Sequence, residues 1–166
     1  MPKVKAAILF FALCVPALAA DLAAGLQAYN KGDYATALNE LLPLAKQGNA
    51  SAQFGLGGMY YYGHGVPQDY KEGLRWFRLA ADQGDVGAQG MLGALYEEGQ
   101  GVPQDYKEAI RWYRLAAEQG YASAQLNLGF MYDKGQGVAQ DNKEAIRWYR
   151  KAADQGDASA QYNLGA

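Results

Sequence analysis

The sequence predicts an all-α protein, an α-solenoid of stacked helical hairpins, and two observations support this. A 36-residue unit is repeated three times without gaps, at residues 49–84, 85–120 and 121–156. Each unit also contains two segments with the apolar spacing of amphipathic helices. Because a single hairpin of this length cannot bury its apolar face, stacked neighbours are needed, and that is the architecture of a solenoid.

The second helix of each unit has a clear start and end. In the middle unit, Asp105 is followed three residues later by Glu108, a variant of the capping box. Apolar residues then recur from Ala109 at i, i+3, i+4, i+7 and i+8, on one face of a helix. Gly120 stands where a left-handed cap is expected. The same signals are Asp69, Glu72 and Gly84 in the first unit, and Asp141, Glu144 and Gly156 in the third.

The first helix of the first unit is expected over about residues 50–62. An apolar stripe at i, i+4 and i+8 starts from Ala52. Gly57 lies in the middle of this helix, as Gly93 and Gly129 do in the later units, although Gly costs about 1 kcal/mol relative to Ala in a helix. The repetition of this cost predicts close packing, and we expect the Trp ring of the second helix to need the space.

Two stretches flank the repeats. Residues 21–48 echo the second half of a unit, and we expect them to form a diverged N-terminal helical hairpin. Residues 157–166 begin a fourth unit that stops within its first helix, so we expect a truncated repeat 4. Solenoids usually end in a polar capping unit. The open end is compatible with a truncated gene, a dimer contact or a marginal terminal unit.

Residues 1–20 have the pattern of a cleaved secretory signal peptide, with a basic start, an apolar core and an Ala-x-Ala end at Ala17 to Ala19. The apolar stretch is shorter than the roughly 20 residues that a membrane helix needs, so we expect no span after signal removal. Cys14, the only cysteine, lies in this segment. We therefore expect an exported protein, periplasmic or extracellular, without disulfides.

Catalytic and metal-binding chemistry is not predicted. The formal net charge of −2 indicates no basic surface for nucleic acid. His64 is the only histidine, and we expect an ordinary loop residue, since its equivalents are Gln100 and Gln136. One His without Cys leaves no nucleophile–base pair and no usual zinc ligand set. Glu97 and Glu98 could do acid–base work, but solvated charge is the commoner role. We predict no enzyme and no cofactor.

The segment from residue 50 to 84, with "ASAQ", "LG", "GHGV", "RWF" and "ADQG" in order, resembles the Sel-one-like repeat (SLR) family, a relative of the tetratricopeptide repeat. The two later copies carry nearly all of these positions, with Gly87 as a departure. The resemblance implies a right-handed superhelix whose first helices line a concave face. It implies a scaffold for protein–protein contact, and many bacterial members are exported. A cysteine-rich branch linked to β-lactam or peptidoglycan binding has disulfides that this sequence lacks.

The contact residues are expected where the units differ while the packing residues stay fixed. Aligned on the tetratricopeptide pattern, the inward positions are aromatic in the first unit, open and acidic in the second, and mixed in the third. Such a face suits an extended peptide or a helix with aromatic anchors and a basic segment. The predicted partner-binding residues are Phe54, Tyr61, Tyr62, Glu97, Glu98, Leu126, Phe130, Asp133 and Lys134.

The favoured function is an exported scaffold or adaptor that binds another protein or a peptide through its concave face, with a possible dimer through the uncapped C-terminal end. The competing function is a cell-wall-associated protein that binds or hydrolyses peptidoglycan or β-lactams. A third interpretation is a structural fragment without its own partner. It also stays open that the concave face is solvated and binds nothing.

Overall fold

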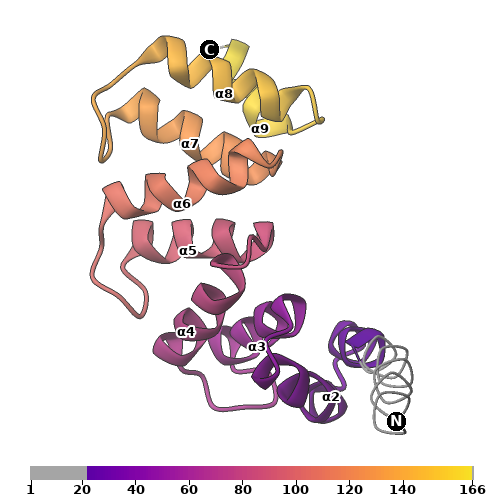
Figure 1. Ribbon diagram of the computed structural model, residues 1–166. Helices are drawn as coiled ribbons and strands as arrows, with labels where there is room; N and C mark the ends of the chain where they lie inside the picture. Colours follow the sequence, from indigo (N-terminus) through magenta and orange to yellow (C-terminus); the bar gives the residue numbers. More distant parts are fainter. Residues whose placement is uncertain (1–21, 166) are drawn as a thin grey trace, which may run out of the picture.

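The computed structural model describes residues 22–165, which form a curved stack of helical hairpins (Figure 1). Every regular element among these residues is a helix, and the predicted signal peptide lies outside them. A helix over residues 22–30 comes first. It is followed by α2 (Tyr34–Lys46), α3 (Ala50–Tyr62), α4 (Tyr70–Ala81), α5 (Val86–Glu98), α6 (Tyr106–Glu118), α7 (Ala122–Lys134), α8 (Asn142–Ala153) and α9 (Ala158–Gly165).

Each repeat contributes one hairpin to the stack. α3 pairs with α4, α5 with α6 and α7 with α8, and these pairs pack more extensively within themselves than against the next hairpin. The colours of Figure 1 run in order along the stack, so hairpins adjacent in sequence are adjacent in space. The first helices α5 and α7 are also in contact with one another, although α6 lies between them in the sequence. This contact supports a curvature with the first helices on the inner side.

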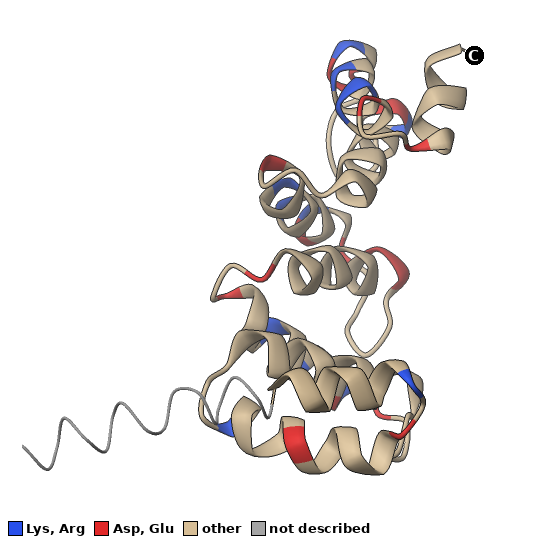
Figure 2. Cartoon of the chain, turned by 90° about the vertical axis from the view of Figure 1, so that its right-hand side faces the viewer, with Lys and Arg blue, Asp and Glu red and all other residues tan. Residues whose placement is uncertain are grey.

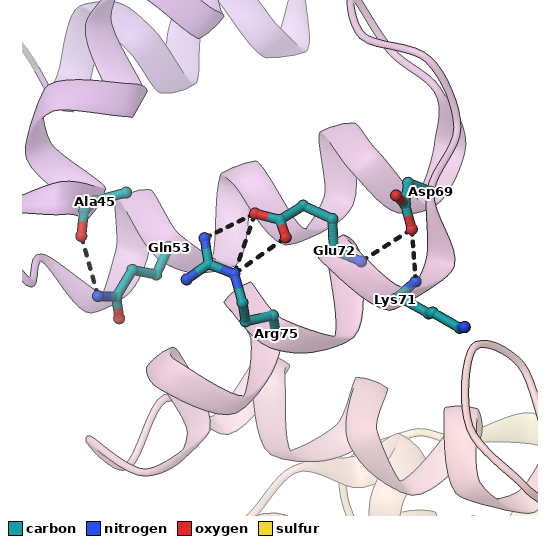
Figure 3. A network of polar contacts seen from close by, with 6 residues as sticks. All are labelled: Ala45, Gln53, Asp69, Lys71, Glu72 and Arg75. Carbon is teal, nitrogen blue, oxygen red and sulfur yellow. Dashed lines mark hydrogen bonds and ion pairs between the residues drawn. The ribbon is translucent and has the colours of Figure 1, made fainter.

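The caps predicted for the second helices are present. Asp69 Oδ1 accepts hydrogen bonds from the backbone N–H groups of Lys71, at 2.9 Å, and Glu72, at 3.1 Å (Figure 3). Asp105 and Asp141 cap α6 and α8 in the same way. Each such cap contributes about 1 kcal/mol of helix stability. Gly120, after α6, has a φ of +94°, which confirms the predicted left-handed position.

The reciprocal half of the expected capping box is not formed at Asp69. Its backbone N–H donates instead to the carbonyl of Tyr60, at 2.9 Å. Glu72 therefore does not reach back, and its Oε1 lies 2.7 Å from Nη2 of Arg75 (Figure 3). The hydrogen bond from Arg75 lowers the pKa of the Glu72 carboxyl. The carbonyl of Tyr60, in the last turn of α3, already accepts from the N–H of Asp69. The Glu72 side chain therefore pairs along its own helix.

The mid-helix glycines have the expected packing role, but the expected partner is wrong. A Cβ on Gly57 would lie 2.5 Å from the ring of Phe77, and Gly93 is equally close to Tyr113. The ring that needs the space belongs to the residue after each Trp. Trp112 is 2% exposed and lies in the core between the first and second repeats. Its cluster contains Phe77, Ala80 and Ala81 of the first repeat and Ala88, Leu92 and Leu95 of its own. Adjacent residues on a helix point about 100° apart, so Trp112 and Tyr113 belong to two different core clusters.

A buried glutamine ladder ties successive hairpins together. The Nε2 of Gln53 donates to the carbonyl of Ala45 in the preceding helix, at 3.1 Å (Figure 3). Its Oε1 accepts from Nε2 of Gln83 at 2.7 Å. Gln89 and Gln125 make the equivalent contacts in the next two units. Because a buried amide without partners is costly, this ladder fixes the register between units.

Candidate functional site

The predicted partner-binding residues all lie on α3, α5 and α7, and we call the surface they share the first-helix face. These helices carry charged residues only in their last turn, so Figure 2 shows most of their length in tan. The Lys and Arg side chains are concentrated on α4, α6 and α8 instead. The two sides of the solenoid therefore differ in chemistry, one mainly apolar and the other strongly charged.

The first unit bears an apolar pocket of about 190 Å³, which we call the α3 pocket. Phe54, Gly58 and Tyr62 lie four residues apart on α3 and so share one face of that helix. The pocket is lined by Tyr29, Phe54, Gly55, Gly58, Tyr62, Phe77 and Met91. Three successive hairpins contribute to it, and two of the predicted contact residues, Phe54 and Tyr62, form part of its wall.

His64 contacts two of the tyrosines that line the α3 pocket, Tyr29 and Tyr62. Nδ1 of His64 lies 3.2 Å from the hydroxyl of Tyr29. The imidazole stacks on Tyr34, with ring centroids 4.4 Å apart, and on Tyr62, at 5.4 Å. Burial, and then the neighbouring Tyr34 and Tyr62, raise the pKa of Tyr29. His64 thus links the N-terminal hairpin to the first repeat and orients two aromatic rings of the pocket.

The last-but-one residue of each first helix interacts with other residues of the fold. These equivalent residues are Tyr61, Glu97 and Asp133. Tyr61 donates from its hydroxyl to Oε1 of Gln100 in the next unit, at 2.6 Å. Glu97 accepts from the hydroxyl of Tyr113, at 2.7 Å. Burial, followed by this hydrogen bond, raises the pKa of Tyr113 well above its usual range. Burial and then the nearby Asp133 raise the pKa of Tyr149.

The remaining predicted residues lie toward the outside of the first-helix face. Tyr62 is 55% exposed and Phe130 is 40% exposed; Glu98 is exposed and Leu126 is partly buried. The Nζ of Lys134 lies 2.7 Å from Asp133 and 5.7 Å from the centre of the Phe130 ring. The third unit therefore presents an aromatic ring beside a neutralised ion pair, without the recess found in the first unit.

Sequence reasoning missed Tyr29, Met91 and His64 as contributors to this region. Tyr29 belongs to the diverged hairpin, where no repeat alignment assigns it a position. His64 could have been found, because its equivalents in the other two units are glutamines. A single aromatic exception in a turn flanked by tyrosines indicates a local cluster of rings.

The second helices carry arginines that pack on the Trp rings. The guanidinium of Arg75 lies 4.4 Å from the centre of the Trp76 ring, and that of Arg111 lies 4.6 Å from Trp112. Arg78 contacts Tyr96 and also lies 5.8 Å from Trp112 in the following unit. These contacts cover core residues from outside, which agrees with packing rather than base stacking.

Residues 22–165 contain neither a metal-binding cluster nor a helix that could span a membrane. This part of the chain contains no group of three or more His, Cys, Asp or Glu residues that could hold a metal ion. Within the same span, no helix has both the length and the apolar character needed to cross a bilayer.

Known structures with the same architecture support this description. The chain is 36% identical to a Sel1 repeat protein from Oxalobacter formigenes, with a TM-score of 0.83 over 87% of this chain and 58% of that one. It is 40% identical to a protective antigen of uropathogenic Escherichia coli that displays an SLR fold, with a TM-score of 0.85 over 89% of this chain and 32% of that one. The chain thus spans less than two thirds of either relative.

A third similarity concerns the fold alone. Cysteine rich protein B of Helicobacter pylori is 20% identical, with a TM-score of 0.63 over 80% of this chain and 95% of that one. No curated protein sequence matches the chain significantly.

The stacked hairpins and their repeated caps define a helical repeat protein. The model of the Sel1 repeat matches residues 50–85, 86–121 and 122–157, and the chain belongs to the Sel1 repeat family. The family and the all-α, right-handed solenoid expected from the sequence are confirmed. Proteins of this family are generally scaffolds for protein–protein interaction.

Proposed function

We propose that the chain is an exported, non-catalytic adaptor that binds a protein or peptide on its first-helix face. The observation that carries this proposal is the contrast between fixed and varied positions. Leu56, Leu92 and Leu128 are equivalent and have no exposure. The equivalent positions 54, 90 and 126 differ in every unit, as do 62, 98 and 134. Variation at accessible positions such as 62, 98 and 134, over a fixed core, is typical of recognition by repeat proteins.

The binding test uses one double variant, whose two positions are chosen by exposure. Tyr62→Ala with Phe130→Ala removes the two accessible rings and leaves Tyr61 with its hydrogen bond to Gln100. A random peptide library is selected on the unsubstituted chain, and the enriched peptides are measured against both proteins. We expect at least about a tenfold loss of affinity in the double variant, with unchanged thermal unfolding. Peptides bound equally by both proteins would place recognition elsewhere.

Export rests on the pattern of residues 1–20 alone. Expression of the full chain in a Gram-negative host, followed by mass measurement of the periplasmic fraction, tests it directly. The expected product begins near Ala20 or Asp21. A cytoplasmic protein that retains residues 1–20 would contradict export.

A dimer through α9 is a separate proposal. Leu164 is 36% exposed, whereas its counterpart Leu128 in the third unit is fully buried. Tyr162 beside it is 77% exposed. Light scattering after size exclusion is expected to give twice the monomer mass, and Tyr162→Ser with Leu164→Ser should return the monomer. A monomeric unsubstituted chain would refute this contact.

A further inference from the structure

The α3 pocket has the size of a single side chain. Its volume of about 190 Å³ lies below the roughly 300–1,000 Å³ of pockets that hold drug-sized ligands or cofactors. Its walls are the rings of Phe54, Tyr62 and Tyr29, together with Met91. Aromatic rings and a methionine form a surface that accepts another large apolar side chain.

The pocket is open because of glycine and is shaped before any partner binds. A Cβ on Gly58 would meet only the hydroxyl of Tyr29, at 3.5 Å. The equivalent positions carry Ala94 and Phe130, so a side chain stands there in each later unit. The stacking of His64 on Tyr62, and its contact with Tyr29, fix two walls. Little reorganisation is then needed on binding, which favours affinity.

The surface next to the pocket is acidic. Glu98 is the counterpart of Tyr62 in the next unit, and it is exposed. Over residues 22–165, no Lys or Arg forms an ion pair with Glu98 or Glu97. The hydroxyl of Tyr61 donates to Oε1 of Gln100, two residues after Glu98, at 2.6 Å, so the acidic end of α5 lies beside the aromatic end of α3. A cation in this place would be complementary.

The spacing between the two features sets the length of the recognised segment. The ends of α3 and α5 lie side by side, since the hydroxyl of Tyr61 donates to Gln100 just after α5, and neighbouring helices lie about 8–10 Å apart. An extended chain rises about 3.3 Å per residue. Three residues of extended peptide therefore connect the α3 pocket to Glu98.

We propose that the α3 pocket binds one aromatic or large aliphatic side chain of an extended peptide, and that Glu98 binds a Lys or Arg about three residues from this anchor. This assignment rests on the proposed function, because it specifies the partner of the first-helix face. The ligand is thus a peptide segment with one apolar anchor and one nearby cation, and it differs from a uniformly apolar or acidic segment.

The experiment is a selection from a random displayed peptide library on the purified chain and on three single variants. Gly58→Leu fills the pocket and replaces a helical glycine with a better helix former, so folding is not weakened by propensity. Ser123→Leu adds the same side chain at an exposed position of α7 in the third unit, away from the pocket and from Glu98. Glu98→Lys reverses the charge beside the pocket.

The expected peptides carry an aromatic or large aliphatic residue with a Lys or Arg two to four positions away, as the ~3.3 Å rise per residue allows. Gly58→Leu should weaken their binding at least about tenfold, while Ser123→Leu changes it less than about twofold. Glu98→Lys should enrich Asp or Glu in place of the cation.

The outcomes separate this assignment from the broader function. Peptides that lose affinity on Phe130→Ala but not on Gly58→Leu would overturn the anchor and keep the first-helix face as the binding surface. Enriched peptides without a cation, or with one that Glu98→Lys does not alter, would overturn the role of Glu98. No enrichment, or binding insensitive to every variant, would overturn both proposals.

Discussion

The first and second repeats share a backbone and a core, yet they end their first helices differently. Ala52 and Leu56 of α3 are fully buried, and so are Ala88 and Leu92 of α5. The last two residues of α3 are Tyr61 and Tyr62, whereas those of α5 are Glu97 and Glu98. The two units therefore differ at the ends of their first helices, while the buried residues that stack the units stay the same.

The comparison shows that variation between units is of two kinds. Tyr62 and Glu98 differ on an accessible surface. Tyr61 and Glu97 differ together with a buried partner, since Tyr61 packs near Phe77, with ring centroids 6.4 Å apart, whereas Glu97 accepts from the hydroxyl of Tyr113. Only the variation on an accessible surface bears on recognition. The variation with a buried partner bears on stability.

The largest effect is expected from the shared core. Trp112→Ala removes a side chain that is 2% exposed and should lower the free energy of unfolding by roughly 3–5 kcal/mol. Chemical denaturation measures it. Lys107→Ala, at an exposed position of the same helix, is the control and should cost less than about 0.5 kcal/mol. A small loss for Trp112→Ala would contradict the role of Trp as the bridge between units.

The core and the helices could be predicted because their signals recur at fixed spacing. Asp105 and Gly120, which bound the second helix, were recognised from the sequence, and the structure places a side-chain cap and a positive φ there. The partner of Gly57 could not be predicted. Trp76 and Phe77 are adjacent and both apolar, and only the direction of each Cα–Cβ bond in the stacked hairpins decides which ring meets the glycine.

The candidate site was harder to predict than the fold. The alignment of units identified Phe54 and Tyr62, because these positions vary. It could not separate Tyr61 from Tyr62, since adjacent residues differ in burial only once the next loop is placed. Tyr29 and Met91 reach the pocket from neighbouring hairpins, and such contacts between units are absent from any single-unit pattern.

A second prediction compares two adjacent glycines of α3. Gly57→Ala places a methyl group against the buried ring of Phe77, and it should destabilise the chain by about 1–3 kcal/mol through overpacking. Gly58→Ala meets only the Tyr29 hydroxyl at 3.5 Å and should stabilise it by up to about 1 kcal/mol through helix propensity. Thermal unfolding of both variants provides the test. Equal shifts in the two proteins would mean that neither glycine has a specific packing role.

A third prediction exchanges the paired residues between units. Tyr61→Glu alone removes the bond to Gln100 and brings a carboxylate toward Phe77, which offers no hydroxyl. Phe77→Tyr added to it recreates the pair formed by Glu97 and Tyr113. The double variant should recover about 1 kcal/mol relative to the sum of the two single changes, as coupled neighbours do. A double-mutant cycle by denaturation measures this coupling, and strict additivity would show that the two positions vary independently.

The smallest predicted effect is the alkaline response of the pair in the second unit. Burial and the bond to Glu97 raise the pKa of Tyr113 above the ordinary value of 10.0. The stabilisation from the protonated phenol is therefore complete below about pH 10 and is lost at higher pH, because the unfolded chain then releases the proton first.

Tyr113→Phe removes that titration while keeping the ring over Gly93. The stability advantage of the unsubstituted chain over Tyr113→Phe should shrink by less than about 1 kcal/mol between about pH 9 and about pH 10.5. Urea denaturation at several pH values measures the difference, with Tyr162→Phe as the exposed control. A constant difference across this range would mean that Tyr113 and Glu97 are not coupled in solution. Both carboxylates at the end of α5 would then be exposed to solvent, and Glu97 as well as Glu98 would be a candidate for binding a basic residue.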